Sequence, residues 1–279
     1  MNYRHAFHAG NFADVFKHAL LARMLVYLAQ KPAPLRYIDT HAGLGRYDLA
    51  SPEAQRTGEW RSGIGRILAE PPPDAVAALL QPWLDCLGPS DAEHRPSVYP
   101  GSPELARRLL RSQDRLSLFE RHPVDASALS AAMQGDPRVR VTAQDGYAGL
   151  NALAPPPERR GLVLIDPPFE ARDEFAAMTQ ALVRAHRKWA TGVYALWYPV
   201  KQAGAGEAFA ADLRRTGVPR ILRVELAVGG AEGLSGCGMA IVNPPFPLQA
   251  EAAILLPFFA ARLRVGLGGH YFLDWVSGE

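Results

Sequence analysis

The 279-residue sequence has only two cysteines, Cys86 and Cys237, and they lie far apart in the chain. Such isolated cysteines form neither a disulfide framework nor a thiolate metal site, and they favour a reducing compartment. No apolar run reaches the roughly 20 residues that a membrane-spanning helix needs. Residues 1–5 also lack the apolar core of a secretory signal. We therefore expect a cytoplasmic protein with no membrane partner.

The sequence also has little excess charge. Thirty Lys and Arg residues stand against 28 Asp and Glu residues, which gives a net charge of +2. This balance excludes a uniformly basic nucleic-acid-binding protein, so any such surface must be a local patch. The length and the hydrophobic content of 48% suit one large domain, or one domain with an inserted subdomain.

Strand-like and helix-like segments alternate along most of the chain. Residues 11–30 have helical spacing, and a short strand follows at 35–39. Ser102 precedes a proline and is expected to cap the helix that follows it. The alternation predicts an α/β fold with a mostly parallel, Rossmann-like sheet covered on both faces. The segments 221–228 and 239–242 are joined by a glycine-rich link and predict an antiparallel pair at one edge.

Residues 51–95 interrupt this alternation. Three prolines at 71–73 break the segment, and residues 75–87 have helical spacing. We interpret 51–95 as a small helical insertion subdomain. The surrounding domain would then consist of residues 1–50 and 96–279.

The most informative motif is Asp-Pro-Pro-Phe at 166–169, which directly follows the apolar strand 161–165. A strand that runs into Asp-Pro-Pro-aromatic is typical of methyltransferases that act on a planar nitrogen, such as the exocyclic amine of adenine. That amine is a poor nucleophile until acceptors hold its protons. The carboxylate of Asp166 and the carbonyl of Pro167 would supply acceptors, and Phe169 a flat face for stacking. From these four residues alone, a proline-rich turn after a strand is the alternative.

Three earlier strand ends carry groups that suit a nucleoside cofactor. A glycine turn occupies residues 39–45, Glu120 could accept from two ribose hydroxyls, and Asp145-Gly146 could take an adenine amino group. Each alone also has a structural explanation, as a tight turn or a solvated charge. Their order, with Asp166 fourth, matches class I S-adenosylmethionine-dependent methyltransferases.

A second turn of the same type, Asn-Pro-Pro-Phe at 243–246, follows the strand 239–242. The order of the strands assigns the reacting group to Asp166, which ends the fourth strand. We expect Asn243, at the end of the last edge strand, to belong to a structural turn.

The N-terminal segment is rich in histidine and aromatic residues. A metal site built from His5, His8 and His18 is one interpretation, but the spacing fits no common zinc pattern and no cysteine supports it. We expect no metal.

Motifs along nearly the whole chain resemble those of the RlmJ family, which methylates N6 of one adenine in 23S ribosomal RNA. They are Tyr-Arg-His-x-Phe-His-Ala-Gly-Asn-x-Ala-Asp-Val at 3–15, Asp-Thr-His-Ala-Gly-x-Gly-Arg-Tyr at 39–47, Tyr-Pro-Gly-Ser-Pro at 99–103, Arg-Arg-Gly-Leu at 159–162, Ala-Leu-Trp-Tyr-Pro at 195–199, Gly-His at 269–270 and Trp-Val at 275–276.

The resemblance implies S-adenosylmethionine as the cofactor, with S-adenosylhomocysteine as the product, and Tyr3 beside the target base. Residues 3–10 would form a lid ordered by ligand. Phe169 departs from the family pattern, which more often has tyrosine there. The implied cofactor contacts are Lys17, His18, His41, Ser102, Glu120, Asp145, Gly146 and Asp166.

The implied partner is 23S ribosomal RNA, either protein-free or in an early assembly intermediate, and the protein would act as a monomer. Three other functions stay open from the residues: a DNA adenine methyltransferase, a protein-glutamine methyltransferase, or an inactive RNA-binding module that kept the fold. The insertion at 51–95 is expected to form one wall of the RNA site.

Overall fold

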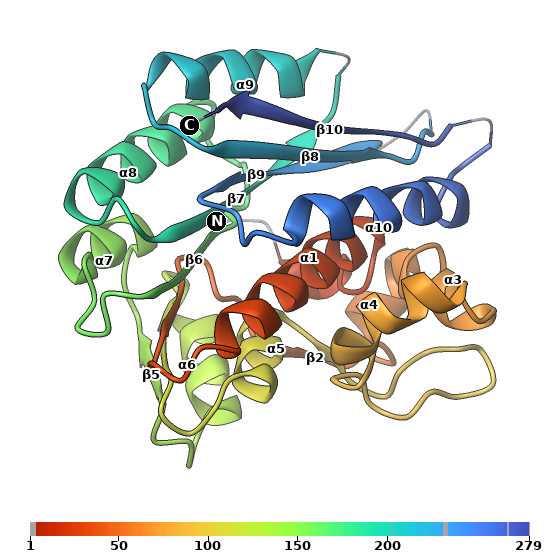
Figure 1. The fold of residues 1–279 in the computed structure, drawn as a ribbon. Helices are drawn as coiled ribbons and strands as arrows, with labels where there is room; N and C mark the ends of the chain where they lie inside the picture. The colour runs from red at the N-terminus through yellow and green to blue at the C-terminus, as the bar shows by residue number, and fades with distance from the viewer. Residues whose placement is uncertain (1–3, 203, 231–233, 267, 279) are drawn as a thin grey trace.

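The structure is a computed structural model that describes residues 4–202, 204–230, 234–266 and 268–278. Within these residues the main sheet has eight strands in the order β10-β8-β9-β7-β6-β1-β4-β5 (Figure 1). A separate two-stranded ribbon pairs β2 (Arg46–Tyr47) with β3 (Tyr99–Pro100). The strands of the main sheet are β1 (Arg36–Asp39), β4 (Arg115–Phe119), β5 (Val139–Thr142), β6 (Gly161–Ile165), β7 (Val193–Val200), β8 (Ile221–Ala227), β9 (Gly236–Val242) and β10 (His270–Ser277).

The directions of the strands confirm a mostly parallel sheet with antiparallel strands at one side. Strands β5, β4, β1, β6 and β7 are parallel to their neighbours in that set. Strand β9 is antiparallel to both β7 and β8, and β10 is antiparallel to β8. The expectation that β9 lies at the edge is wrong. It is inserted between β7 and β8, and the edge strand is β10, which the sequence pattern did not reveal.

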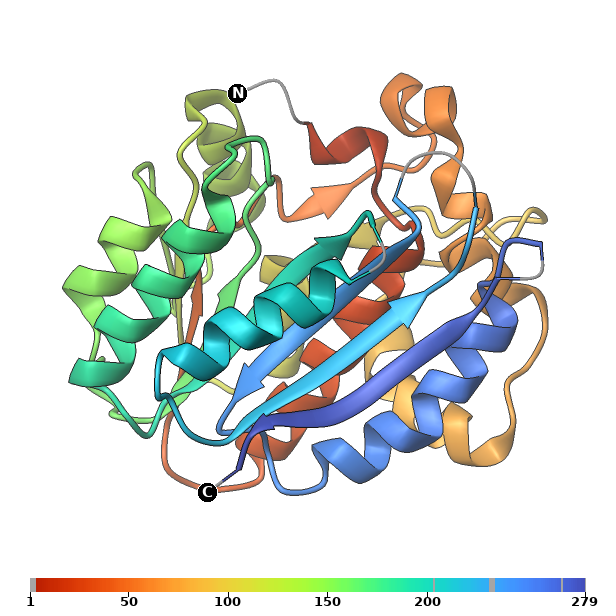
Figure 2. The ribbon, with the colours of Figure 1, turned by 90° about the horizontal axis from the view of Figure 1, so that it is seen from above.

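Helices cover both faces of the sheet, as Figures 1 and 2 show. On one face lie α7, α8 and α9, and on the other lie α1, α5 and α10. The helical elements are η1 (His5–Phe7), α1 (Phe12–Ala29), α2 (Pro52–Thr57), η2 (Glu59–Arg61), α3 (Ile64–Ala69), α4 (Asp74–Leu84), α5 (Ser102–Leu109), α6 (Pro123–Ala132), α7 (Gly146–Leu153), α8 (Glu174–Lys188), α9 (Ala205–Arg215) and α10 (Leu248–Arg262).

Strand β6 shows why two apolar layers form. Successive side chains of a strand point to opposite faces. Leu162 and Leu164 therefore join the core beneath α1, whereas Val163 and Ile165 join the core beneath α8. A fully apolar strand is thus required at the centre of the sheet, and this strand carries Asp166 at its carboxyl end.

Several helix starts follow local sequence signals. Asn11 caps α1 by accepting from the amide of Asp14, and Asp145 caps α7 by accepting from Ala148. Ser102 was expected to cap α5, but that prediction is wrong because Gly101 is the cap residue and the helix begins at Ser102. The hydroxyl of Ser102 instead donates to a buried carboxylate, a stronger acceptor.

The segment 51–95 is mainly helical, in agreement with its composition. Its helix α4 packs against α1 and α10. Trp60 and Trp83 are fully buried in the same apolar cluster as the inner side of α1. The insertion therefore shares a core with the sheet domain. The boundaries at 51 and 95 stay a prediction.

Candidate active site

A cavity of about 1020 Å³ opens at the carboxyl edge of the parallel strands. This is the edge where open α/β sheets bind ligands, and the volume is at the upper end of the range for small-molecule sites. Tyr3 lies outside the described residues. The other predicted site residues all line this cavity: Lys17, His18, His41, Ser102, Glu120, Asp145, Gly146, Asp166, Pro167 and Phe169.

An ion pair joins Asp166 to α1. Lys17 Nζ lies 2.6 Å from Asp166 Oδ2 and 3.0 Å from Asp14 Oδ1, and its side chain is only 7% exposed. Burial opposes the charge of Lys17, but the two carboxylates outweigh it and hold the pKa of Lys17 well above its usual value. Lys17 therefore stands between two carboxylates and contacts both.

Asp14 connects this group to the N-terminal segment. Its Oδ2 accepts from the amide of Gly10 at 2.9 Å and lies 2.9 Å from His5 Nε2. Burial would raise the pKa of Asp14, but His5 and Lys17 hold it well below its usual value. Asp14 was not assigned a role from the sequence, although its i, i+3 spacing from Lys17 puts both on one helical face.

Glu120 is held beside the glycine turn. Its Oε2 accepts from the amide of Gly43 at 2.9 Å, and its Oε1 accepts from the amide of His122 at 2.8 Å. Gly43 has a φ of 60°, in the left-handed region that favours glycine. Each carboxylate oxygen keeps a second lone pair, so Glu120 can still accept from a ligand.

Behind the glycine turn lies a buried carboxylate, Asp39, which begins the motif at 39–45 but was assigned no role from the sequence. Asp39 Oδ2 accepts from the hydroxyls of Tyr37 and Ser102, each at 2.7 Å. Its Oδ1 accepts from the amide of His41 at 3.2 Å. Burial raises the pKa of Asp39 to about 6. Asp39 thus orients two residues that line the cavity, Ser102 and His41.

Two histidines of the cavity, His18 and His41, are kept neutral. His18 Nδ1 lies 2.9 Å from the hydroxyl oxygen of Tyr99, and burial lowers the pKa of His18 to about 3. Burial likewise lowers the pKa of His41 to about 4. The edge of the Tyr147 ring lies against His41, with 5.2 Å between ring centroids. Neutral imidazoles can accept as well as donate a hydrogen bond.

Gly146 starts α7 where the chain passes close to the first strand end. A Cβ atom at this position would lie 1.8 Å from the carbonyl oxygen of Thr40, so only glycine fits. The preceding Asp145 uses one oxygen to cap α7, and its side chain is 46% exposed. It is available to a ligand at the cavity wall.

Aromatic rings surround the Asp-Pro-Pro-Phe turn. Phe169 has a φ of 50° and its ring centroid lies 4.9 Å from that of Phe175 and 5.9 Å from that of Trp197. Trp197, at the carboxyl side of β7, also lies 5.8 Å from Lys17 Nζ. It lines the cavity and was not predicted as a site residue, although it falls in the motif at 195–199.

The Asn243 turn lies at the opposite end of the strands from the cavity. Because β9 runs antiparallel to β7, its last residue, Val242, pairs with Tyr194 at the start of β7. Asn243 Nδ2 donates to the carbonyls of Ala190 and Gly192, at 2.8 and 2.9 Å. Asp166 follows Ile165, which pairs further along β7 with Leu196. Strand direction thus separates the two turns.

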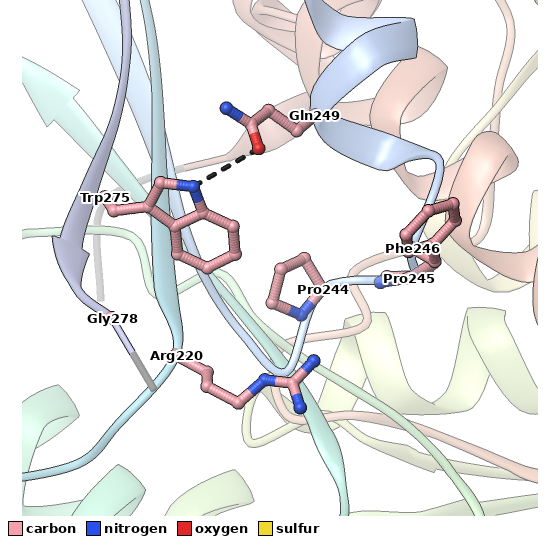
Figure 3. A pocket seen from close by; sticks show the side chains of 7 residues that line it. All are labelled: Arg220, Pro244, Pro245, Phe246, Gln249, Trp275 and Gly278. Carbon is pink, nitrogen blue, oxygen red and sulfur yellow. Dashed lines mark hydrogen bonds between the residues drawn. The ribbon is translucent and has the colours of Figure 1, made fainter.

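A second cavity, of about 400 Å³, lies beside this turn (Figure 3). Pro244, Phe246 and Trp275 line it, and the Trp275 indole donates to Gln249 at 3.2 Å. None of the predicted cofactor residues lines it.

Among the described residues, no three His, Cys, Asp or Glu side chains are placed to hold a metal ion together. In the same part of the chain, no helix has both the length and the apolar character for crossing a membrane.

The sheet and the cavity at its carboxyl edge define a class I methyltransferase fold. Comparison with known proteins identifies the family. The chain belongs to the family described as "Ribosomal RNA large subunit methyltransferase D, RlmJ", whose model matches residues 32–277. This confirms the resemblance inferred from the motifs.

Two relatives are both called "Ribosomal RNA large subunit methyltransferase J". The protein of Escherichia coli K12 is 40% identical and that of Haemophilus influenzae is 38% identical, and each match covers 100% of both chains. The crystal structure of protein LPL1258 from Legionella pneumophila is also similar. It has a TM-score of 0.87 and 37% identity, over 97% of this chain and 98% of that one.

Proposed function

We propose that this protein transfers the methyl group of S-adenosylmethionine to the exocyclic N6 of one adenine in 23S ribosomal RNA, at position 2030. The observation that carries the proposal is the single cavity that holds both Asp166 and Glu120. One group suits a planar amine and the other a ribose. The names of the relatives support a large-subunit ribosomal RNA as the substrate. The RNA would be protein-free or in an early assembly intermediate, in the cytoplasm.

The cavity fits a nucleoside cofactor. Glu120 is already oriented by two backbone amides, and its remaining lone pairs suit the two ribose hydroxyls. Asp145 suits the amino group of the adenine ring. Gly146 lies close to the backbone of Thr40 and has no side chain to fill the space that the adenine ring would occupy. When bound, S-adenosylmethionine supplies an electrophilic methyl group on a positively charged sulfur. His18, His41, Ser102 and Lys17 would complete the cofactor site.

Asp166 is prepared to orient the target amine. Lys17 occupies Oδ2, and among the described residues no hydrogen bond reaches Oδ1. One oxygen is therefore free to accept from N6, while the ion pair fixes the rotamer. The carbonyl of Pro167 would supply the second acceptor. These groups hold the lone pair of N6 toward the methyl group, which is catalysis by positioning.

Charge also favours transfer. As N6 attacks in line, it becomes cationic, and the nearby carboxylate of Asp166 stabilises that charge. The proton of N6 becomes acidic only after transfer, so Asp166 need not be a strong base. Phe169 would stack on the base, which must leave any helix it occupies to enter the cavity.

The alternatives differ in substrate. A protein-glutamine methyltransferase would need an Asn-Pro-Pro turn after β6. The Asn243 turn instead follows β9 and lies at the end of the sheet where β7 begins. A DNA adenine methyltransferase would use the same Asp166 chemistry. An inactive RNA-binding module would not need a cofactor site.

The test incubates purified protein and labelled S-adenosylmethionine with protein-free 23S ribosomal RNA, DNA or ribosomal protein. We expect N6-methyladenine in the RNA alone. Asp166→Ala should abolish transfer without unfolding the protein, whereas Asp166→Asn should keep some activity because its amide oxygen accepts one hydrogen bond. Wild-type activity in Asp166→Ala would disprove the mechanism, and methylation of DNA alone would disprove the substrate.

A further inference from the structure

Arginines gather where the insertion meets the end of α10. Arg66 Nη1 donates to the carbonyl of Arg264 at 2.6 Å, and Arg262 Nη1 donates to the carbonyl of Arg66 at 3.2 Å. These bonds hold α3 beside the carboxyl end of α10, two segments that lie side by side in Figure 1. The η2 turn that ends at Arg61 comes directly before α3 in the chain. We call Arg61, Arg66, Arg262 and Arg264 the arginine rim.

The arginine rim borders the catalytic cavity. Ser62, which follows Arg61, lines that cavity, and so does Val265, which follows Arg264. A strand of nucleic acid whose base enters the cavity would therefore continue over or beside these arginines.

The rim has more positive than negative charge. Arg262 pairs with Glu70 at 3.4 Å, and Arg61 pairs with Glu93 at 3.6 Å. Both acids are largely exposed, with 77% and 64% of their side chains accessible, so these pairs are screened by water. Among the described residues, neither Arg66 nor Arg264 has an ion-pair partner. A bound polyanion would complement this excess of positive charge.

Part of the rim has a structural explanation. Arg66 and Arg262 donate to backbone carbonyls near the ends of α3 and α10, which lack partners inside their helices. That explanation does not extend to the exposed side chains of Arg61 and Arg264. The guanidinium of Arg61 lies over the buried Trp60 ring, 4.5 Å from its centroid, which restricts its orientation.

We infer that the arginine rim binds phosphates of the RNA strand that flanks the target adenine. The inference rests on the proposed function and adds the surface that holds the RNA. Arginine suits this role because its planar fork matches two phosphate oxygens. A base turned into the cavity leaves its neighbouring phosphates outside the cavity, where the arginine rim borders it. Phosphate contacts would fix the register of the strand without reading its sequence.

The test compares two double variants. Arg61→Ala/Arg264→Ala removes the two exposed rim cations. Arg140→Ala/Arg187→Ala is the matched control, because both arginines are exposed, neither lines the cavity, and neither has an ion-pair partner among the described residues. The dissociation constant for protein-free 23S ribosomal RNA is measured at several salt concentrations. Cofactor affinity is measured by calorimetry on the same samples.

We expect the rim variant to bind RNA at least about tenfold more weakly than the wild type, with the slope of log Kd against log salt reduced by about two. Its affinity for S-adenosylmethionine should match the wild type, which shows that the fold is intact. The control should bind RNA like the wild type. Arg61→Lys/Arg264→Lys should recover part of the affinity because the charges return.

Unchanged RNA affinity in the rim variant would overturn the inference. An equal loss in the control would also overturn it, because the attraction would then be diffuse. Failure of the proposed function looks different. The wild type itself would then methylate no RNA while still binding the cofactor, and the inference would fall with it.

Discussion

Lys17 Nζ lies 2.6 Å from Asp166 Oδ2, and this ion pair joins residues 149 positions apart in the sequence. It links the N-terminal helix to the turn after the central strand. Because Lys17 also contacts Asp14, which in turn accepts from the backbone of Gly10, the position of the Asp166 carboxylate depends on the N-terminal segment. The cavity is thus assembled from both halves of the chain.

Replacing Lys17 by methionine should destabilise the protein by about 3–5 kcal/mol, because it removes the counter-charge of the half-buried Asp166 and leaves the buried Asp14 with His5 alone. Urea unfolding at neutral pH measures this. Adding Asp14→Asn to Lys17→Met should restore part of the loss, since a buried carboxylate that has lost one of its two cations disappears. If Lys17→Met alone unfolds like the wild type, the pair is screened by water and does not fix Asp166.

Glu120→Ala should weaken binding of S-adenosylmethionine by roughly 1.5–3 kcal/mol, the range for hydrogen bonds that involve a charged group. Calorimetry measures the cofactor affinity. RNA affinity should stay nearly unchanged, which serves as the internal control. Glu120→Gln is the conservative comparison, because it keeps one acceptor oxygen for Gly43 or His122. An unchanged cofactor affinity in Glu120→Ala would mean that this carboxylate only supports the glycine turn.

Asn243→Ala should reduce stability by about 1–3 kcal/mol and leave turnover per folded molecule unchanged. The variant loses two hydrogen bonds to backbone carbonyls, and alanine is strained at the φ of 51°. Asn243→Gly separates the two effects, since glycine accepts this φ but makes no side-chain bond. Turnover and urea unfolding are measured on the same samples. A selective loss of turnover would show that the Asn243 turn has a catalytic role.

Local patterns predicted the parallel strands and the antiparallel pairing of β8 with β9, but not the place of β9 between β7 and β8 or the edge strand β10. Strand β6 is short, apolar and followed by a polar residue, so its place at the centre could be predicted from composition alone. Strand β9 has the same short, apolar pattern followed by a polar residue. It nevertheless lies between β7 and β8 and runs antiparallel to both. The order and direction of strands depend on connections and on packing between distant segments, which a local pattern does not contain. Strand β10 was missed because it alternates weakly and ends the chain.

The candidate site illustrates the same limit. Glu120 and Asp145 could be placed at the cavity because both follow strands of the parallel sheet. Asp39 was assigned no role from the sequence, because it accepts from Tyr37 and Ser102, and Ser102 is 63 residues away. The Ser102 error has the same cause. The local pattern predicted a helix cap, but the Ser102 hydroxyl instead donates to Asp39, a buried acceptor that is distant in the sequence.

The N-terminal segment is predicted to be a lid. His8 lies 2.9 Å from a carboxylate oxygen of Glu59 in the insertion, and Ala9 is buried. Because His8 and Ala9 contribute to the packing of the insertion, the deletion that tests the lid removes only residues 1–7. It should spare folding, weaken cofactor binding modestly and nearly eliminate turnover. By linkage, RNA and cofactor should each tighten binding of the other in the full chain. Hydrogen exchange of residues 4–8 with and without S-adenosylmethionine tests the idea, and equal protection in both states would indicate a fixed wall.

Acid should destabilise the protein through His18. Burial lowers the pKa of His18 in the folded state to about 3, from an ordinary value of 6.5. Between about pH 6.5 and pH 3 the His18 side chain therefore binds a proton in the unfolded chain but not in the folded chain. The free energy of unfolding falls as the pH drops through this range. The loss from this residue should reach roughly 3 kcal/mol near pH 4.5. His41 acts in the same direction, whereas Asp39, with its raised pKa, partly offsets both. Urea unfolding at pH 7 and pH 4.5 should show a smaller difference for His18→Gln than for the wild type, and equal differences would show that His18 is not kept neutral.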